Sequence, residues 1–373
     1  MATIPPGATV AVTGASGFIG SHVVEACLKA GYVVRACVRD PSNEAKVAHL
    51  EALAAKHGGA VELARGDLLE AGSFDAAFDG AAAVVHVAAV VEILKVSDPV
   101  RDIVDPSLEG CRNVLASVEK HLATIKKFVH TSSCIAVAAV DSKGGGATYD
   151  EADFNGWSTV ETDPYGFAKS SAEALVREAC ETMALPLATL NPGVTLGPCF
   201  TKQHTKASTV LLRELLYGNK MLNYNCCFVD VRDVGAAHAR RDAASMIRIN
   251  RCLSMPATGR HLLVNDAGVM NTLDLGAVAK AACPQWKTVA APMYAPALIS
   301  ALRVVYDAPL VGPSLAGLAG ITEFKLRVFE EKIPFSNARA KRSLVLAFVP
   351  LVDTVRDAMA SMVEGGWVKA KAA

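Results

Sequence analysis

The chain has 373 residues, of which 51% are hydrophobic and 20% are charged. This balance is typical of a globular protein and excludes a disordered chain. The 37 basic side chains equal the 37 acidic ones in number, so charge gives no reason to expect nucleic acid or an acidic membrane as a partner.

Ten cysteines are scattered along the chain without the paired spacing of a zinc or redox motif, which predicts free thiols and no metal. The first seven residues lack a basic stretch followed by an apolar one, so no signal peptide is predicted. No run reaches about 18 apolar residues, so no membrane-spanning helix is predicted either. These features favour a cytoplasmic protein in a reduced compartment.

Apolar and amphipathic runs alternate through the first half of the chain. The predicted strands cover residues 9–12, 32–38, 61–64, 81–89, 125–131 and 187–190. The predicted helices cover residues 18–30, 107–122 and 163–183. Fully apolar strands separated by helices predict an α/β fold with a Rossmann-type, doubly wound parallel sheet. In such sheets ligands lie beyond the carboxyl ends of the strands.

The second half is less regular. A helix is predicted at 206–217, a strand edge returning to the sheet at 228–233 with a helix after it, a last strand at 261–264 and a final helix at 353–363. Residues 292–321 are apolar but interrupted by prolines, which predicts short helices of a substrate lobe or an oligomer contact, with a membrane-surface contact less favoured. We expect residues 1–193 plus about 226–265 to form a dinucleotide-binding domain. Residues 194–225 and 266–373 would then form a smaller, mostly helical substrate lobe.

A glycine-rich stretch, residues 13–20, stands between the first predicted strand and helix. Gly14 allows a tight turn, Gly17 lets a phosphate approach the backbone, and Gly20 lets the helix pack close to the strand. The helix N-terminus then directs unpaired N–H groups at an anion. The stretch therefore predicts a pyrophosphate site, whose other candidate contacts are Ser16, Phe18 and Ile19. A structural turn is the alternative.

The end of the second strand bears on the choice between NADPH and NADH. Arg39 follows that strand and can pair with a 2′-phosphate, and Lys46 lies seven residues on. Asp40 is the competing signal for NAD(H). Two cations against one carboxylate favour NADPH. Asp67 follows the third strand and could accept from the adenine amino group or cap a helix, and its spacing leaves both open.

Tyr165 and Lys169 are four residues apart in a predicted helix, so they share one face. The lysine ammonium is expected to lower the pKa of the tyrosine phenol, which is near 10 in water, and to reach a nicotinamide ribose. Taken alone, this pair is better explained as two surface residues of an amphipathic helix. Thr131 and Ser133 at the end of the preceding strand change that, because the Ser133 hydroxyl could bind a carbonyl oxygen in the same crevice.

As a set, these motifs resemble the extended short-chain dehydrogenase/reductase family, and most of all its dihydroflavonol reductase-like branch. The resemblance covers about residues 8–265 and rests on Thr13 to Gly20, Val38-Arg39-Asp40-Pro41, Gly66-Asp67-Leu68, Val85-His86-Val87-Ala88, Thr131-Ser132-Ser133, Tyr165-Gly166-Phe167-Ala168-Lys169 and Asn191-Pro192-Gly193.

This resemblance implies Ser133 as the carbonyl-polarising hydroxyl, Tyr165 as the proton donor and Lys169 as its tuner. It also implies Arg39 and Lys46 on the 2′-phosphate. The further cofactor contacts implied are Leu68, Val87, Ala88, Ala89, Thr131, Pro192, Gly193 and Val194.

Two positions depart from the branch. Ala138 stands where dihydroflavonol reductases place an asparagine for ring hydroxyls, which argues against a catechol-bearing flavonoid. Ser107 aligns with the asparagine that is the family's fourth catalytic member. The stretch 321–351 is similar instead to 3β-hydroxysteroid dehydrogenase-like proteins, which use the same catalytic set to oxidise alcohols.

The sequence therefore predicts an NADPH-dependent oxidoreductase that reduces a ketone or aldehyde to an alcohol, working as a monomer or homodimer. One alternative is a 3β-hydroxysteroid dehydrogenase-like NAD(P)-dependent alcohol oxidation or a sugar-nucleotide epimerase. Another is a regulator that senses the dinucleotide without chemistry, although the retained Tyr165 and Lys169 argue against it.

Overall fold

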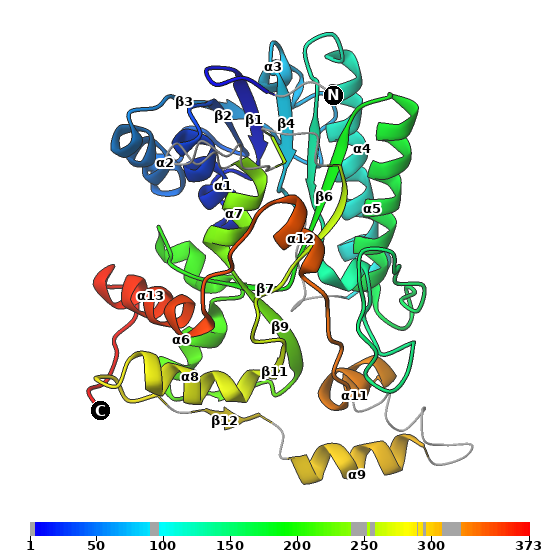
Figure 1. Cartoon of the computed structure of the whole chain (residues 1–373), viewed down its shortest axis with the longest axis vertical. Coiled ribbons are helices and arrows are strands. Elements are labelled where there is room, and N and C mark those ends of the chain that lie inside the picture. The colour runs from blue at the N-terminus through cyan, green and yellow to red at the C-terminus, as the bar shows by residue number, and fades with distance from the viewer. Residues whose placement is uncertain are drawn as a thin grey trace.

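A seven-stranded, entirely parallel sheet forms the upper half of the molecule in Figure 1. Its strand order is β10-β6-β5-β4-β1-β2-β3. The strands are β1 (Thr9–Thr13), β2 (Val33–Val38), β3 (Val61–Arg65), β4 (Ala83–His86), β5 (Phe128–Thr131), β6 (Leu187–Pro192) and β10 (Gly259–Leu263). The computed structural model describes residues 4–89, 97–239, 252–253, 258–288, 290–293, 296–307 and 322–373.

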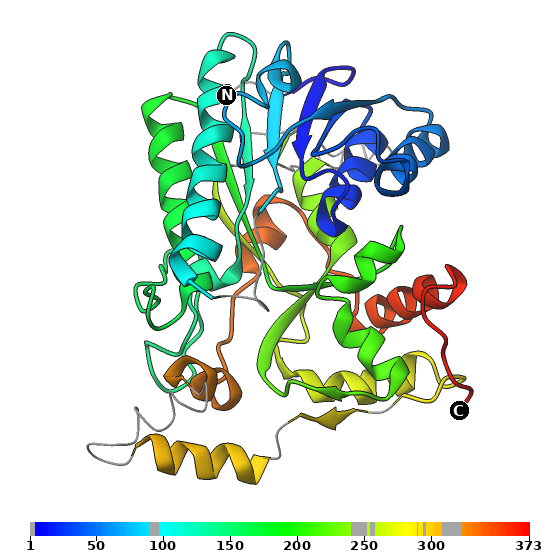
Figure 2. The ribbon, with the colours of Figure 1, turned by 180° about the vertical axis from the view of Figure 1, so that it is seen from behind.

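Helices cover both faces of this sheet, as Figures 1 and 2 show. One face carries α1 (Phe18–Lys29), α2 (Glu44–His57) and α7 (Val231–Ala239). The other carries α3 (Asp75–Phe78), α4 (Asp105–Lys120) and α5 (Pro164–Thr182). Successive side chains of a strand point to opposite faces, so Val10 and Val12 of β1 join the first core and Ala11 the second. The predicted doubly wound fold is confirmed.

A second region lies below the sheet in Figure 1 and contains two small sheets. Its strands are β7 (Val194–Leu196), β8 (Lys220–Met221), β9 (Asn225–Asp230), β11 (Val269–Asn271) and β12 (Ala291–Pro292). Its helices are α6 (Val210–Tyr217), α8 (Leu275–Ala282), α9 (Pro296–Tyr306), α11 (Glu323–Glu330) and α13 (Leu351–Glu364). Short helical turns are η1 (Val100–Val104), η2 (Cys134–Ala136), η3 (Lys202–Lys206) and η4 (Thr272–Asp274). An apolar core joins α6, α8 and α13 to β9.

The prediction that residues 228–233 return to the main sheet is wrong. β9 ends at Asp230 and pairs with β7 and β11 in the three-stranded sheet, and residues 231–233 already belong to α7. The edge of β6 that it would have joined is taken by β10, which pairs Gly259 with Ala188. The predicted last strand is therefore confirmed as the partner of β6.

The C-terminal part of the chain contributes to both regions. Helix α12 (Ala338–Ser343) places Ala340 and Leu344 in the core of the main sheet. The Asn337 side chain donates to the Val264 carbonyl oxygen at 2.9 Å and fixes this segment beside β10. Helix α13, by contrast, packs in the core of the second region. The expected split of the chain into two domains stays a proposal.

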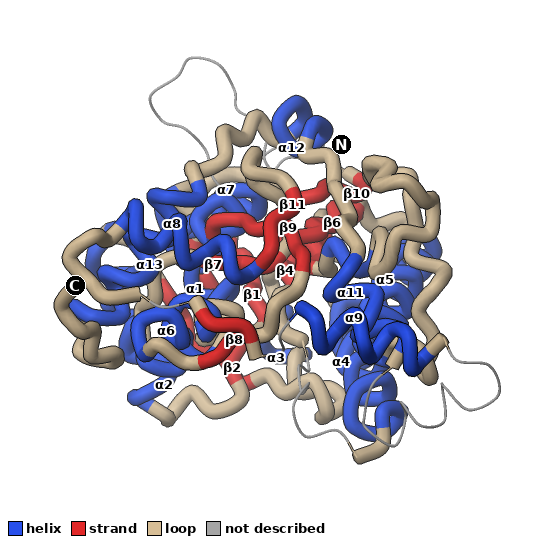
Figure 3. Tube along the Cα trace, turned by 90° about the horizontal axis from the view of Figure 1, so that it is seen from below, coloured by secondary structure: helices blue, strands red, loops and turns tan. Residues whose placement is uncertain are grey.

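Helix α9 lies at the lower margin of the molecule in Figure 1, and the view from below in Figure 3 shows it next to α11. An ion pair between Arg303 and Glu330, 2.8 Å long, joins the two helices. Leu298 and Val304 of α9 are exposed. One helix is thus confirmed inside the apolar 292–321 segment, and residues 308–321 lie outside the described part of the chain. None of the described helices is long and apolar enough to cross a membrane.

Candidate active site

The carboxyl ends of β1, β4, β5 and β6 lie side by side at the lower edge of the main sheet, facing the second region (Figure 2). The predicted site residues follow these strand ends: the glycine-rich turn after β1, Val87 after β4 and Ser133 after β5. Tyr165 and Lys169 approach the same edge from α5. The parallel sheet therefore brings together residues that are far apart in the sequence.

The glycine-rich turn has no room for side chains. Gly14 has a φ of 65°, and a Cβ there would lie 2.8 Å from the Ala88 Cα. A Cβ on Gly20 would lie 2.0 Å from the Gly14 carbonyl oxygen. The expected close approach of helix and strand is therefore present, and any L side chain at these positions forces backbone atoms to move.

The N-terminus of α1 offers donors to an anion. Its N-cap, Gly17, is exposed, and no side chain in the described structure caps the first turn. A helix of 12 residues whose first N–H groups lack intrahelical partners favours a phosphate there. The Phe18 ring, however, is buried in the apolar core of the second region, so only its backbone can meet a ligand.

A histidine that was not predicted from the sequence contacts this turn. His204 of η3 has its Nε2 3.2 Å from the Ser16 carbonyl oxygen, and its ring stands edge-on to Phe18 at 5.8 Å. Burial lowers the pKa of His204 below its usual value, so the ring is neutral near pH 7 and donates one N–H. No motif around residue 204 predicts this contact, because it forms only when the second region packs against the glycine-rich turn.

The end of β2 presents its charges to solvent. Arg39 and Lys46 are both exposed, which leaves them accessible to a phosphate. The Asp40 carboxylate accepts from the Ser42 backbone N–H at 3.0 Å and from its hydroxyl at 2.6 Å. These bonds hold the pKa of Asp40 below its usual range, and Lys46 adds to the effect. The carboxylate that would favour NADH over NADPH is thus already hydrogen-bonded within its own turn.

The end of β3 makes a turn of the same kind. Asp67 accepts from the Leu69 N–H at 3.0 Å, while its own N–H donates to Ser73. The Asp67 carboxylate therefore closes a turn and caps no helix that the structure describes, and the adenine contact stays a prediction. The Leu68 side chain packs near Gly110 of α4, and its carbonyl accepts from Asn113 at 2.8 Å.

The segment after β4 is fixed to the glycine-rich turn. The Thr13 hydroxyl accepts from the N–H groups of Val87 and Ala88, both at 3.2 Å, and bonds the His86 ring at 2.8 Å. Ala89 is exposed at the end of this segment. These residues therefore pack directly against Gly14, beside the predicted dinucleotide site.

Residues after β6 cross into the second region. The Gly193 N–H donates to the Leu263 carbonyl at 3.0 Å, and a Cβ on Gly193 would lie 2.5 Å from the Cys227 carbonyl oxygen. Pro192 ends β6 and Val194 begins β7, so both flank this crossing. Thr131 points elsewhere: its hydroxyl lies 2.9 Å from His238 Nε2 of α7, beneath the sheet edge.

The three predicted catalytic residues converge, and all are half-buried. The Lys169 Nζ lies 5.9 Å from the centre of the Tyr165 ring. Ser133 begins the turn η2, and its hydroxyl accepts from the Ile135 N–H at 3.3 Å. The thiol of Cys134, next to Ser133, is close enough to Tyr165 to influence its ionisation. Helix α5, which carries Tyr165 and Lys169, therefore packs against the turn that follows Ser133.

The expected direction of the Tyr165 pKa is wrong for the protein alone. Burial raises the pKa of the Tyr165 phenol above its usual value, and the neighbouring Cys134 and Asp163 add to the rise. Burial also lowers the pKa of the Lys169 ammonium. Desolvation is the largest cause of both shifts, and the ammonium lies 5.9 Å from the centre of the ring. The phenol is consequently held protonated.

Ser107 does not take the place of a fourth catalytic residue. Its hydroxyl donates to the Ile103 carbonyl oxygen of η1, the turn before α4, at 2.6 Å. One turn further along α4, Cys111 is the residue close enough to Lys169 to raise its pKa, and its Sγ lies 3.7 Å from His86 Nε2. Burial raises the pKa of the Cys111 thiol to about 11 and lowers that of His86 to about 3. Both are therefore neutral near pH 7.

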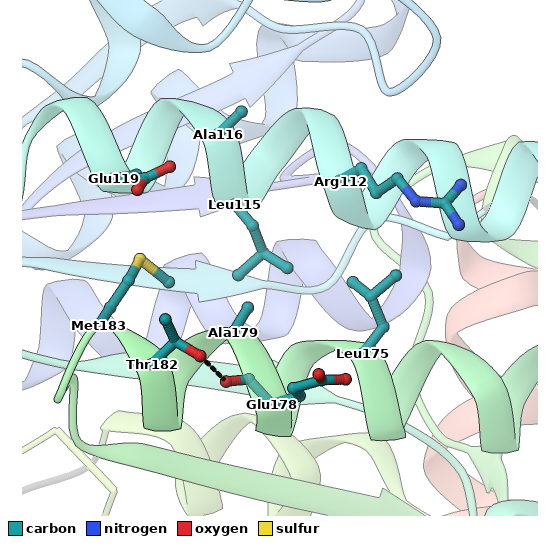
Figure 4. Close-up of a pocket in the computed structure, with 9 residues that line it drawn as sticks. All are labelled: Arg112, Leu115, Ala116, Glu119, Leu175, Glu178, Ala179, Thr182 and Met183. Atoms are coloured by element: carbon teal, nitrogen blue, oxygen red, sulfur yellow. Dashed lines mark hydrogen bonds between the residues drawn. The ribbon is translucent and has the colours of Figure 1, made fainter.

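These features fit a dinucleotide. The glycine-rich turn is a cradle that any Cβ would fill, the α1 N-terminus supplies donors, and exposed cations follow β2. No cluster of His, Cys, Asp or Glu able to hold a metal occurs among the residues that the structure describes. A separate shallow hollow lies between α4 and α5, away from the strand ends (Figure 4). Its lining includes Leu115, Leu175 and Met183.

Comparisons with known proteins agree with this geometry. The family model of the NAD dependent epimerase/dehydratase family matches residues 10–242. A cinnamoyl-CoA reductase (CAD2) of Medicago truncatula is 33% identical over 268 residues, covering 69% of this chain and 76% of that protein. A dihydroflavonol 4-reductase of Callistephus chinensis is 35% identical over 199 residues, covering 52% of this chain and 53% of that protein.

A solved structure shows the same fold over nearly the whole chain. The Gre2 protein of Candida albicans in complex with NADPH superposes with a TM-score of 0.73 at 22% identity, covering 96% of this chain and 99% of that one. By sequence, the chain spans between about half and three quarters of the two curated relatives described above. The chain belongs to the NAD dependent epimerase/dehydratase family, in the branch that contains the dihydroflavonol and cinnamoyl-CoA reductases.

Proposed function

We propose that the protein is an NADPH-dependent reductase that converts a ketone or aldehyde to an alcohol. The observation that carries the proposal is the packing of α5, with Tyr165 and Lys169 on one face, against the turn that follows Ser133. The reductase names of the relatives and the NADPH in the Candida structure support the same assignment.

The proposed chemistry assigns one task to each side chain. When bound, the reduced nicotinamide supplies a hydride to the carbonyl carbon. The Ser133 hydroxyl donates a hydrogen bond to the carbonyl oxygen and so favours the negative charge that develops there. The Tyr165 phenol gives its proton to that oxygen, which yields the alcohol. The Lys169 ammonium stabilises the phenolate left behind.

The protonation state of Tyr165 determines which half of the reaction it can begin. A reductase needs a protonated donor at this position, and an alcohol dehydrogenase needs a phenolate base. Burial raises the pKa of the phenol, so the protein without cofactor presents the protonated donor that reduction uses. An oxidative, 3β-hydroxysteroid dehydrogenase-like role would require the ionised form.

The preference for NADPH over NADH rests on the end of β2. Arg39 and Lys46 are exposed cations, and the only nearby competitor, the Asp40 carboxylate, already accepts two hydrogen bonds from Ser42. A guanidinium pairs well with a phosphate. Substrate selection is assigned to the second region, with β9 included. A cytoplasmic location and a monomeric or homodimeric state stay predictions.

A panel assay tests the proposal. The purified protein is incubated with NADPH and a set of aliphatic and aromatic aldehydes and ketones, and the products are identified by mass spectrometry. We expect alcohol formation with at least one class of carbonyl compound. Turnover only of hydroxysteroids with NAD⁺ or NADP⁺, or epimerisation of a nucleotide sugar, would contradict the proposal. Cofactor binding without any turnover would favour a dinucleotide-sensing regulator.

A further inference from the structure

A buried carboxylate lies on the catalytic face of α5. Glu173 stands one helical turn beyond Lys169 and two turns beyond Tyr165, so the three side chains share one face of the helix. Glu173 is 6% exposed. A buried carboxylate is costly unless it is paired and hydrogen-bonded, so its partners show what it holds in place.

One carboxylate oxygen of Glu173 accepts hydrogen bonds from the segment that follows β5 and from the neighbouring strand β6. Oε2 accepts from the Ser132 hydroxyl at 2.5 Å and from Asn191 Nδ2 at 2.7 Å. The same Asn191 amide donates to the Ser133 carbonyl oxygen at 3.0 Å. The carboxylate therefore ties α5 to the ends of β5 and β6 at the residue proposed to bind the substrate oxygen.

The other oxygen is paired with an arginine from the edge strand β10. Arg260 Nε lies 2.5 Å from Glu173 Oε1, and both side chains are less than 10% exposed. The guanidinium also donates to the Ala136 carbonyl at 3.2 Å, at the far end of the turn that begins after Ser133. It donates further to the carbonyls of Glu151 and Asp153 and lies over the Phe154 ring. The arginine of the ion pair thus fixes the last residue of η2, while Ser133 precedes the first.

We propose that Glu173, held by Arg260, is a positioning residue that fixes Ser133 against the helix carrying Tyr165 and Lys169. The inference rests on the proposed function and deepens it. Glu173 does not contact the reacting atoms. It acts through Ser132 and Asn191, which set the backbone of Ser133, while Arg260 fixes Ala136. A hydroxyl displaced by a fraction of an ångström no longer meets the developing oxyanion, so the loss appears in turnover.

Glu173 also influences the charge of Lys169. The titratable groups that face Lys169 are Cys111 of α4, Glu173 and Tyr165 of α5, His86 of β4 and His130 of β5. Burial lowers the pKa of Lys169, and the Glu173 carboxylate and Cys111 oppose that effect. Removal of the Glu173 charge therefore lowers the pKa of Lys169 further.

Kinetics of Glu173→Gln test the positioning role. The amide keeps the size and one acceptor oxygen but loses the charge. We expect kcat to fall about 10- to 100-fold, with NADPH affinity within twofold of wild type, and the alkaline loss of activity to begin at lower pH. Glu173→Leu, which also loses the acceptor, should fall further. Glu181→Gln, an exposed position on the same helix, is the matched control and should behave as wild type.

A second measurement is independent of turnover. In protein labelled with ¹³C at lysine Cε, the Lys169 signal is assigned by its absence in Lys169→Arg and is titrated with pH. We expect a lower titration midpoint in Glu173→Gln and an unchanged one in Glu181→Gln. If wild type reduces no carbonyl compound, the proposed function fails while this titration still decides the role of Glu173. Unchanged kcat in an active enzyme, or an unchanged Lys169 midpoint, overturns the inference.

Discussion

The main-sheet region and the second region differ in what they bury. The sheet and its helices bury the neutral histidines His22, His86, His130, His238 and His261. The second region buries His204 of η3, whose ring stands against Phe18. Its ion pairs are partly exposed: in the contact of Arg232 of α7 with Asp230 and Asp357, the arginine side chain is 35% exposed. Of the six histidines that are buried in the described part of the chain, five therefore lie in the main-sheet region and one lies in the second region.

This difference implies a division of labour. Changes at the strand ends should abolish chemistry or cofactor binding, whatever the carbonyl compound. Changes in the second region should alter stability or substrate preference and leave the cofactor site intact. Each of the following experiments strengthens or breaks that division.

Tyr165→Phe should have the largest effect. Without the phenolic proton, the oxygen of the reduced carbonyl has no positioned donor, so kcat should fall roughly a hundred- to ten-thousandfold. NADPH affinity, followed by nicotinamide fluorescence, should stay within about twofold. Normal turnover by this variant would remove Tyr165 from the mechanism.

Acid should destabilise the main-sheet region first. Burial lowers the pKa of His22, His238 and His261 to about 4 and that of His86 to about 3, from an ordinary 6.5. Between these values the unfolded chain binds more protons than the native protein, so stability rises with pH and falls on acidification through this window. Each such histidine should cost about 1–2 kcal/mol between pH 7 and pH 5.

Hydrogen exchange at pH 5 and pH 7 checks this regional claim. Peptides from β4 and α7 should lose protection before peptides from α6, α8 and α13. Simultaneous loss, or earlier loss in the second region, would show that the buried histidines do not control acid stability.

Gly20→Ala tests the close approach of α1 to the glycine-rich turn. A methyl group there would lie 2.0 Å from the Gly14 carbonyl oxygen, so the helix must move. We expect a loss of about 3 kcal/mol in the free energy of unfolding, measured with urea, together with weaker cofactor binding. Gly156→Ala is the control, because nothing lies within 4 Å of its Cβ position. Equal stability of the two variants would contradict the predicted crowding.

Arg39→Ala should change cofactor choice. Loss of one charge-assisted contact to a phosphate costs about 1.5–3 kcal/mol, which corresponds to roughly a 10- to 100-fold weaker Kd for NADPH. The Kd for NADH should not change. Fluorescence titrations with both nucleotides measure these Kd values. Equal or tighter binding of NADH than of NADPH by wild type would show that Asp40, and not Arg39, determines the cofactor preference.

Val304→Ser should have the smallest effect. This α9 side chain is 72% exposed, so its replacement should change the free energy of unfolding by less than about 0.5 kcal/mol. NADPH affinity should also stay unchanged, in keeping with the division between regions. A shift in cofactor affinity would show that α9 communicates with the strand ends.

Local signals made much of the fold and site predictable. The glycine-rich turn depends on neighbours within eight residues, and the Tyr165–Lys169 pair on one turn of helix, so sequence spacing sufficed to place them. The position of β9 depends on which sheet edge is already occupied by β10, a fact that no local pattern contains. The destination of the Phe18 ring likewise depends on the second region packing against α1.

Electrostatics were less predictable for the same reason. The pKa of Tyr165 is set by how far water is excluded from it, and the spacing to Lys169 gave only the opposing contribution. Glu173 and Arg260 come from a helix and a distant edge strand, so nothing in the sequence pairs them. His204 reaches Ser16 only through the folded second region.

The most direct test of the central claim follows the hydride itself. NADPH carrying deuterium at the transferable C4 position is incubated with the protein and a carbonyl compound that it consumes, and the product is analysed by mass spectrometry. The proposed reaction predicts an alcohol with one deuterium on its carbinol carbon, formed by wild type and nearly lost in Tyr165→Phe. A product without deuterium, or equal labelling by Tyr165→Phe, would contradict hydride transfer with Tyr165 as the proton donor.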